Sequence, residues 1–331
     1  MKGLTEKKLS VIEEGAFLEI IHVTNTNRQN TLLKAKPCVM ALGFFDGVHL
    51  GHQQVIKEAK KQAEEKKLPL VIMSFFPHPK EVLSNGKKIV PYLMPMTDKQ
   101  KIFKKLGADV FYIVQFNTEF ASLSPKQFVQ RYLLDFGVKQ VVAGFDFTYG
   151  CRGEGNMTRI KSDSDGRIDG IKVNKIEFEG EKISSTLIRN LIFSGELEKI
   201  PRYLGDYYQI KGRVGLNKHN ADILVNPYYL LPASGIYEVT VTNKLIASKL
   251  TALVFNGMLK LLSLYEQRFP FKENETIRLY WNKRLPKEIS NQEDVSQELI
   301  GSSGIPGSVP NSLSPGGRKV HRLHLPSLLK W

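Results

Sequence analysis

The sequence predicts an α/β fold, in which helices cover both faces of a parallel sheet, followed by a second region made of β-strands. Two observations support this prediction. Short, continuous apolar runs alternate with amphipathic helical segments over the first two hundred residues, and the pattern becomes β-rich from about Tyr207. Continuous apolar strands are typical of parallel sheets, which are buried on both faces. Ligands of such sheets bind beyond the carboxyl ends of the strands, so we expect the functional residues there.

The first two predicted strands each precede a helix. PCVMALGFF (37–45) is an apolar run that ends in glycine and aromatic residues, and a helix rich in lysine and glutamate follows over 52–66. LPLVIMSFF (68–76) is the second predicted strand. Thr97 with Gln100 has the pattern of a capping box, which predicts the start of a helix that ends at the next glycine.

The next two predicted strands continue the alternation. ADVFYIVQF (108–116) is the third strand and VKQVVAGF (138–145) is the fourth. Between them, Ser124 as N-cap and Pro125 at the first helical position predict a helix that reaches about Phe136. The alternation of strand and helix therefore extends through the first half of the chain.

The chain divides into four predicted segments. Residues 1–17 form an N-terminal extension, 18–206 the α/β domain and 207–290 the β-rich domain, in which Gly, Pro and Asn turns separate the strands. The end of the chain, 291–331, contains GSSGIPGSVPNSLSPGG, which cannot bury a core, and then a basic stretch. We predict that this tail is disordered.

Size and composition exclude several classes of protein. The chain has 331 residues, enough for two ordinary domains, and it is 42% hydrophobic and 24% charged, as in globular proteins. No apolar run approaches the ~20 residues that span a bilayer, and acids stand where a signal peptide needs an apolar core. Two cysteines, Cys38 and Cys151, allow neither a disulfide framework nor a cysteine-built zinc site. We therefore predict a cytoplasmic protein with no membrane partner.

The net charge of +14 does not identify a partner by itself. Such an excess suits nucleic acid, an anionic membrane surface or a multiply phosphorylated small substrate. Many lysines, however, stand in helical runs such as 57–67, where acids at i, i+4 spacing indicate a solvated surface. We expect no nucleic-acid partner, and the sequence leaves the oligomeric state open.

The first motif with chemical meaning is GFFDGVHLGH (43–52), directly after the first predicted strand. Gly43 and Gly51 let a ligand approach the backbone. His49 and His52 lie on one face of a helix start, where free N–H groups and the helix dipole favour an anion. Two imidazoles there suit a triphosphate and its leaving pyrophosphate. The alternative, metal ligands or structural histidines, is less favoured because no third-ligand pattern such as H-E-x-x-H is present.

The second motif is ISSTLIR (183–189). Ser184 or Ser185 can cap the following helix and form an anion cradle, and Arg189 is spaced to return over the same helix start as a phosphate clamp. An ordinary N-cap with a surface arginine is the alternative. Pairing with the histidine motif across one sheet favours phosphate binding. The absence of G-x-x-x-x-G-K-[ST] excludes P-loop chemistry.

Four motifs together resemble a known family. GFFDGVHLGH, FFPHP (75–79), AGFDFTYGCRGEG (143–155) and ISSTLIR occur in an order and at spacings similar to those of the bacterial FAD synthetases, the bifunctional riboflavin kinase/FMN adenylyltransferases. The resemblance covers about 18–212. It implies a Rossmann-like H-x-G-H nucleotidyltransferase domain followed by a riboflavin-kinase-like β-barrel.

The resemblance implies a reaction of flavin biosynthesis, FMN + ATP giving FAD + pyrophosphate, with Mg²⁺. The FMN phosphate oxygen would attack the α-phosphorus of ATP in line, without a covalent enzyme intermediate, so positioning and charge stabilisation would supply the catalysis. The implied catalytic residues are His49, His52 and Arg189. The implied ATP-binding residues are Gly43, Phe44, Phe45, Gly51, Ser184, Ser185 and Thr186. Phe75, Pro77 and His78 are the implied flavin-binding residues, and Asp146 the implied metal or phosphate contact.

Two of these assignments have structural alternatives. Phe75, Pro77 and His78 fit a hydrophobic loop that packs on the sheet as well as a flavin site. Asp46 fits an N-cap of the first helix as well as a ligand contact.

The barrel region departs from the family. IKGRV (210–214) and YLLPASGIYEV (229–239) resemble pieces of the kinase, but the Pro-Thr-Ala-Asn motif that binds ATP and Mg²⁺ is missing from GLNKHNADILVNPY (215–228). The family's kinase base, a Glu just before a His, has no match in 256–271, where the context of Glu266 differs. Without these groups phosphoryl transfer loses charge stabilisation. Our hypothesis is an adenylyltransferase with a shortened, degenerate barrel that has lost kinase activity.

Other readings stay open. The chain could be a bifunctional enzyme whose kinase survives, another H-x-G-H nucleotidyltransferase, or a non-catalytic module that binds flavin or nucleic acid. A class I aminoacyl-tRNA synthetase would need a K-M-S-K-S-like loop where ISSTLIR stands. The FFPHP and FDFTYG stretches favour a flavin acceptor.

Overall fold

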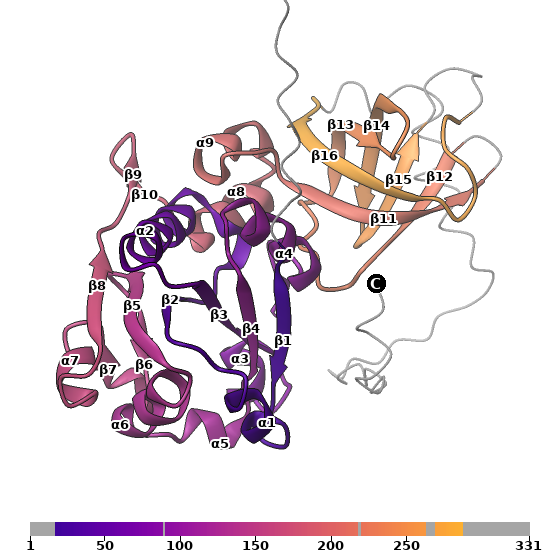
Figure 1. Cartoon of the computed structure of the whole chain (residues 1–331). Helices are drawn as coiled ribbons and strands as arrows, with labels where there is room; N and C mark the ends of the chain where they lie inside the picture. Colours follow the sequence, from indigo (N-terminus) through magenta and orange to yellow (C-terminus); the bar gives the residue numbers. More distant parts are fainter. Residues whose placement is uncertain (1–16, 89, 218–219, 263–268, 287–331) are drawn as a thin grey trace, which may run out of the picture. The chain divides into compact units, whose positions relative to one another are not determined.

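The computed structural model describes residues 17–88, 90–217, 220–262 and 269–286, which form two compact units (Figure 1). Within these residues the first unit comprises 17–194, 199–208 and 228–230, and the second comprises 195–198, 209–227 and everything from 231 onward. The predicted N-terminal extension, apart from Phe17, and the predicted tail lie outside the described residues. Among the described helices, none is long and apolar enough to cross a membrane.

The first unit is built on a six-stranded parallel sheet with the strand order β1-β4-β3-β2-β5-β8. Its strands are β1 (Glu19–Val23), β2 (Cys38–Leu42), β3 (Leu70–Phe76), β4 (Val110–Gln115), β5 (Val138–Gly144) and β8 (Asp169–Val173). The four predicted strands are β2 to β5, so the predicted parallel sheet is confirmed. From β2 the chain proceeds to β3 and β4 on one side, whereas β5 pairs on the other side. The topological switch point therefore lies between β2 and β5, where sheets of this kind bind ligands.

The two edge strands, β1 and β8, are absent from the sequence prediction. Their sequences, EIIHV and DGIKV, mix polar and apolar residues, and most of their side chains are exposed or half-buried. An edge strand is paired on one side only and need not be apolar throughout. A search for continuous apolar runs therefore finds the centre of this sheet and overlooks its edges.

The longer helices of the first unit follow the predicted positions. They are α2 (Leu50–Lys66), α4 (Met96–Lys105) and α8 (Ser185–Ser194), and α6 (Pro125–Phe128) continues as a π-helix over Val129–Leu134. The predicted cap at Ser124 is confirmed, since Ser124 and Gln127 form a capping box. The capping box predicted at Thr97 and Gln100 is wrong. The helix begins at Met96, and its N-cap is Pro95, whose side chain forms no capping hydrogen bond.

Short elements complete the first unit. They are the helices α1 (Arg28–Leu32), α3 (Pro79–Leu83), α5 (Thr118–Ala121), α7 (Ile160–Asp163) and α9 (Pro201–Leu204), and the hairpins of β6 (Thr148–Tyr149) with β7 (Gly155–Asn156) and of β9 (Glu177–Phe178) with β10 (Glu181–Lys182). The hairpin of β6 and β7 lies in the stretch that follows β5, at the carboxyl end of the sheet.

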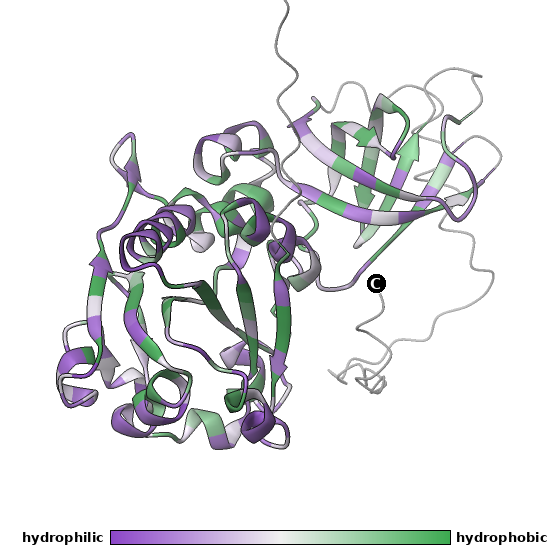
Figure 2. Cartoon of the chain, viewed as in Figure 1, coloured by the Kyte–Doolittle hydropathy of each residue, from purple (hydrophilic) through white to green (hydrophobic). Residues whose placement is uncertain are grey.

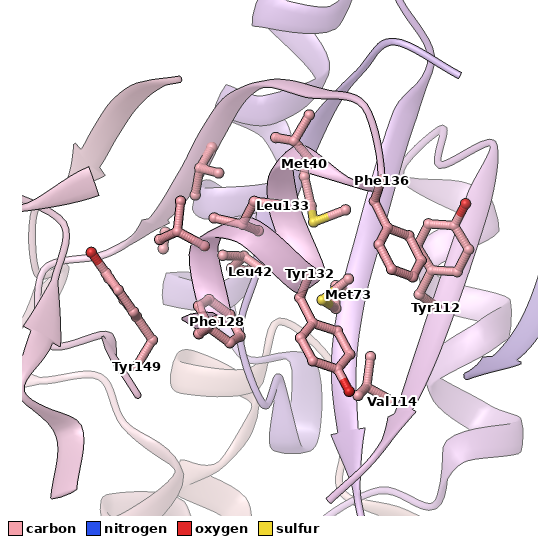
Figure 3. Close-up of a cluster of buried hydrophobic side chains, with 14 of the residues drawn as sticks. Met40, Leu42, Met73, Tyr112, Val114, Phe128, Tyr132, Leu133, Phe136 and Tyr149 are labelled. Atoms are coloured by element: carbon pink, nitrogen blue, oxygen red, sulfur yellow. The ribbon is translucent and has the colours of Figure 1, made fainter. Parts of the chain in front are cut away.

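The core of the first unit occupies both faces of the sheet. Alternate residues of β2 belong to different clusters: Met40 and Leu42 pack with the α6 segment, and Val39 and Ala41 pack with α2 and α4. Figure 2 shows the central strands as predominantly hydrophobic, and Figure 3 shows the cluster around Met40. Helices thus cover both faces of the sheet, as predicted.

The second unit is a closed antiparallel barrel with the strand order β11-β12-β15-β14-β13-β16. Its strands are β11 (Gln209–Leu216), β12 (Asn220–Val225), β13 (Gly235–Thr242), β14 (Ala247–Phe255), β15 (Met258–Leu262) and β16 (Thr276–Arg284). Trp281 is fully buried and packs edge-on against Tyr237. The predicted β-barrel is confirmed, and closure leaves it no free sheet edge. Glu266 lies outside the described residues.

Candidate active site

A cavity of about 960 Å³ opens at the carboxyl ends of the first unit's strands. Its volume is at the upper end of the range of about 300–1,000 Å³ that is usual for small-molecule sites. Segments from all four motifs line it, although they are far apart in the sequence. The predicted residues in its wall are Gly43, Phe44, Phe45, His49, Gly51, His52, Phe75, His78, Asp146, Ser184, Ser185, Thr186 and Arg189. Pro77 is the one predicted site residue that does not line the cavity.

The turn between β2 and α2 has an unusual backbone. Phe45, Gly47 and Val48 all have positive φ, at 50°, 78° and 44°. A Cβ on Gly47 would lie 3.0 Å from a methyl of Leu93, so glycine is needed there for space as well as for conformation. Bulky residues seldom adopt positive φ, and such strain concentrates at ligand sites. The tertiary contacts of this turn hold it in a strained but defined shape.

His49 and His52 form a stacked pair at the start of α2. Their ring centroids are 3.6 Å apart, and His49 is the N-cap, with its Nδ1 accepting a hydrogen bond from the backbone N–H of His52 at 3.3 Å. Asp46, which the sequence offered as an N-cap, does not have that role. The predicted placement of both imidazoles at one helix start is correct.

Both imidazoles are neutral at physiological pH. Burial lowers the pKa of His49 from 6.5 to about 4 and lowers the pKa of His52 well below its ordinary value. Because Nδ1 of His49 accepts a hydrogen bond, its single proton is on Nε2, which can donate to a ligand. Nδ1 of His52 is buried without a hydrogen-bond partner. Leaving a buried polar atom without a hydrogen bond costs folding free energy, unless a ligand or a water molecule bonds to it.

Asp46 connects the histidine motif (43–52) to the ISSTLIR motif (183–189). Its buried carboxylate accepts hydrogen bonds from the backbone N–H groups of Leu93 at 3.1 Å and Met94 at 3.3 Å, and it forms an ion pair with Arg189. The hydroxyl of Ser185 donates to the backbone carbonyl of Asp46 at 2.9 Å. The start of α8 is therefore attached to the turn that carries the histidines.

The helix start at ISSTLIR is capped as the sequence predicted. Ser184 Oγ accepts a hydrogen bond from the backbone N–H of Leu187 at 3.2 Å. Arg189 is only 22% exposed, so it is not the free surface arginine that the alternative required. Ser184 caps the helix, the Ser185 hydroxyl bonds to Asp46, and Thr186 lines the cavity.

Asp146 stands on the opposite side of the switch point, after β5. Its carboxylate forms an ion pair with Lys182 at 2.8 Å, and the Lys182 ammonium lies 4.4 Å from the centre of the Phe145 ring. Sequence reasoning missed Lys182, for which the only signal was its place just before ISSTLIR. Among the described residues no group of three or more His, Cys, Asp or Glu side chains could hold a metal ion. Proteins usually bind Mg²⁺ together with a nucleotide, through one or two carboxylates and the substrate phosphates. A single carboxylate such as Asp146 fits Mg²⁺ only in that form.

The loop after β3 carries the predicted flavin residues. The Phe76–Pro77 peptide is cis, and His78 is the N-cap of α3, accepting from the N–H of Lys80 at 3.0 Å. The His78 ring packs edge-on against Phe44, with centroids 4.5 Å apart. Burial, with the positive charge of Arg189, lowers the pKa of His78 to about 4. His78 thus packs against Phe44 and also lines the cavity, together with Phe75.

Lys99 is a buried charged residue that sequence reasoning missed. Its side chain in α4 is fully buried, and Nζ donates to the backbone carbonyl of Phe44 at 2.9 Å. Ser74 Oγ donates to the same carbonyl, also at 2.9 Å. Burial lowers the pKa of Lys99 to about 8. No local pattern distinguishes this lysine from the solvated lysines around it, so only the fold reveals its role.

One end of the cavity is aromatic. Tyr149 stacks with Phe128 at 5.2 Å between centroids, and its hydroxyl donates to the buried Asp163 at 2.7 Å (both rings are labelled in Figure 3). Phe116, Phe120 and Phe147 line the same cavity. The sequence singled out the stretch that contains Tyr149 but not the ring itself. The cavity therefore has a polar end with two helix starts and an aromatic end.

Comparisons with known proteins agree with this arrangement. The family model described as FAD synthetase matches residues 32–187. A bifunctional riboflavin kinase/FMN adenylyltransferase of Listeria monocytogenes is 48% identical over 209 residues, 61% of this chain and 67% of that protein. The corresponding protein of Bacillus subtilis is 37% identical over 295 residues, 82% of this chain and 91% of that one.

A solved structure supports the same relationship. The crystal structure described as a macrolide-efflux protein from Streptococcus pneumoniae has a TM-score of 0.69 and 27% identity, and the match covers 81% of this chain and 100% of that one. The matched family model and the identities to two bifunctional enzymes are decisive. The chain belongs to the FAD synthetase family of nucleotidyltransferases.

Proposed function

We propose that this chain is an FMN adenylyltransferase that converts FMN and ATP to FAD and pyrophosphate, and that its barrel has lost riboflavin kinase activity. One observation carries the first part. The stacked histidines at the start of α2 and the Ser184–Arg189 segment at the start of α8 meet in one cavity at the switch point of a parallel sheet. This arrangement offers two helix starts to one polyphosphate.

The polar end of the cavity is the proposed ATP phosphate site. His49 offers its Nε2–H, and Gly51 offers the backbone of the first turn of α2, where a Cβ would meet the His49 ring at 3.2 Å. Ser184, Ser185 and Thr186 offer the start of α8. Phe45 acts indirectly in this proposal, because its buried ring packs edge-on against His52. Gly43 and Phe44 contribute the turn above β2.

The proposed reaction is a single in-line displacement. A phosphate oxygen of FMN forms a bond to the α-phosphorus of ATP while the bond from that phosphorus to the bridging oxygen of pyrophosphate breaks. Negative charge grows on the departing pyrophosphate. His49, His52 and Arg189 can stabilise this charge without forming a covalent bond, so catalysis rests on positioning and electrostatics.

Mg²⁺ is the metal that we propose for this reaction, with Asp146 as its protein ligand. When bound, it would supply positive charge to the phosphates. Asp146 would hold the metal, and without it the Asp146 carboxylate forms an ion pair with Lys182. The nucleotide phosphates and water would supply the metal's other ligands.

The aromatic end of the cavity and the loop after β3 are the proposed flavin site. Phe75 and His78 line the cavity there, and flat aromatic rings suit a planar heterocycle. Pro77 supports the loop rather than the ligand in this proposal, since it is absent from the cavity wall. A cytoplasmic location and the absence of a nucleic-acid partner remain predictions from the sequence.

The proposed loss of kinase activity rests on the barrel's sequence. The turn between β11 and β12 lacks the family's nucleotide motif, and the nearby Asp222 interacts with Asn217 at 2.7 Å and Lys260 at 4.0 Å. The second candidate function is a bifunctional enzyme. It is favoured by the similarity to the Bacillus subtilis protein, which extends over 82% of this chain, and by the closure of the barrel.

A two-substrate assay tests both parts of the proposal. The purified chain is incubated with ATP and Mg²⁺, with FMN in one tube and riboflavin in the other, and products are separated by chromatography. We expect FAD from FMN and no product from riboflavin. FMN or FAD from riboflavin would show that the kinase survives. If folded protein forms no FAD from FMN, the adenylyltransferase proposal is wrong and a non-catalytic binding module becomes the better reading.

A further inference from the structure

Three residues between β12 and β13 belong to the first unit, although the chain on either side of them belongs to the second. They are Tyr228, Tyr229 and Leu230, which we call the strap. Tyr229 and Leu230 are buried, with 7% and 4% of their surfaces exposed. The chain therefore passes from the second unit into the first for three residues and then returns, so the strap is part of the packing of the first unit.

The strap pairs by its backbone with Tyr92. The Tyr92 N–H donates to the Tyr228 carbonyl at 2.7 Å, and the Leu230 N–H donates to the Tyr92 carbonyl at 3.2 Å, in a parallel bridge. The rings of Tyr92 and Tyr228 are 5.4 Å apart. The hydroxyl of Tyr208 also donates to the Leu230 carbonyl, at 2.6 Å. Tyr92 is therefore held through both of its backbone groups.

Tyr92 and the two residues after it hold the active-site turn. The N–H groups of Leu93 and Met94 donate to Asp46, the partner of Arg189. The Tyr92 hydroxyl accepts the backbone N–H of His78 at 2.9 Å. One short segment thus faces the strap on one side and supports both the phosphate and the flavin ends of the cavity on the other.

A side chain of the strap makes a second connection. The Tyr229 hydroxyl donates to the buried Asp98 carboxylate in the first turn of α4 at 2.5 Å. The next residue of α4 is Lys99, whose ammonium holds the Phe44 carbonyl. Buried hydrogen bonds to charged groups are stronger than neutral ones and fix geometry well.

We propose that the strap positions the adenylyl-transfer site, with Tyr229 as its principal positioning residue. In this proposal the stretch of chain between β12 and β13 has a role in adenylyl transfer that does not depend on kinase chemistry. This inference rests on the proposed function for its kinetic readout. A displacement of reacting groups by a fraction of an ångström lowers a rate strongly, so small changes in the strap should affect turnover.

The test uses the full-length protein with Tyr229→Phe, and with Tyr237→Phe as the matched control. Tyr237 is a buried barrel tyrosine whose hydroxyl donates to the neutral Ala233 carbonyl at 2.6 Å, so the control removes a buried tyrosine hydrogen bond that has no connection to the active-site turn. We expect Tyr229→Phe to lower kcat for FAD formation by about 5- to 20-fold, whereas Tyr237→Phe stays near wild type. Tyr229→Phe should also lose more thermal stability than Tyr237→Phe, because its hydroxyl donates to a carboxylate.

A double-mutant cycle with Asp98→Asn separates positioning from a general loss of stability. If the two side chains act together, the fall in kcat caused by Tyr229→Phe is smaller in the Asp98→Asn background than in the wild-type background. Equal kcat values for Tyr229→Phe and Tyr237→Phe, or additive effects in the cycle, would overturn the inference.

Amide hydrogen exchange gives a readout that does not need activity. Exchange over residues 44–49 and 92–94 should be faster in Tyr229→Phe and unchanged in Tyr237→Phe. If wild type forms no FAD, the proposed function fails, and the exchange result alone decides on the strap. If wild type is active and exchange is the same in both variants, the strap inference is wrong while the proposed function stands.

Discussion

The two units differ in where they place polar groups. Among the described residues, the first unit buries nine polar or charged side chains, including Asp46, His49, Asp98 and Lys99, whereas the barrel buries only Thr251. Burying polar groups has a high cost unless each is paired. Of these nine side chains, Asp46 and His49 line the cavity, and Ser74 and Lys99 hold the carbonyl of Phe44 in its wall. The barrel's interior, built around Trp281, is a scaffold of apolar packing.

The same difference holds for the ion pairs of the two units. In the barrel, Asp222 and Lys260 are 55% and 29% exposed and 4.0 Å apart, the form of a surface pair that contributes little. In the first unit, Asp46 is buried and connected to three backbone or side-chain groups across the motifs. Preorganised buried groups are the kind that stabilise charge in a transition state.

If the buried polar groups of the first unit carry the chemistry, the largest loss of kcat should come from His49→Ala. Loss of one preorganised donor lowers kcat by about 10²- to 10³-fold, and we expect that loss in FAD formation measured at saturating ATP and FMN. His22→Ala is the matched control, because His22 is exposed on β1 and does not line the cavity. A His49→Ala enzyme within tenfold of wild type would remove His49 from the catalytic role.

Lowering the pH should reduce the unfolding free energy of the first unit by an intermediate amount. The folded pKa of His49 is about 4, below the ordinary 6.5, so between these values the unfolded chain binds more protons. Stability from this group is complete above pH 6.5 and is lost as pH falls toward 4. The expected loss from His49 alone is about 1–2 kcal/mol of unfolding free energy between about pH 7 and about pH 5.

Urea unfolding with two probes can assign this loss to one unit. The described helices of four or more residues all belong to the first unit, so far-ultraviolet circular dichroism follows it, and Trp281 fluorescence follows the barrel in a Trp331→Phe background. The described histidines, including His49, also belong to the first unit. The dichroism transition should therefore move further with acid than the fluorescence transition. It should move less in His49→Ala; equal movement in both proteins would contradict the assignment.

The smallest expected effect comes from deleting residues 292–331. Every residue in the wall of the cavity lies between Leu42 and Arg189. We therefore expect kcat and KM for FAD formation to be unchanged, measured beside the full-length chain at two salt concentrations. A large loss of activity in the shortened protein would give the tail a function that our proposal does not include.

The sequence by itself determined the central architecture and the motifs of the site. Strands β2 to β5 are apolar because both of their faces are buried, and this property can be read locally. Ser124 and Ser184 are caps, which are also local. Local reading failed at Thr97, because the N-cap of this helix is Pro95, two residues earlier.

Only the tertiary structure decided how these pieces act together. Asp46 and Arg189 are 143 residues apart in the chain, and Asp98 and Tyr229 are 131 apart. No periodicity or capping pattern links such residues, because their pairing depends on strand order and on which helix faces which loop. Lys99 resembles its solvated neighbours in the sequence and differs from them only by burial. Sequence patterns report the physics of a few adjacent residues, whereas the connections that support this site arise from the folding of distant segments onto one another.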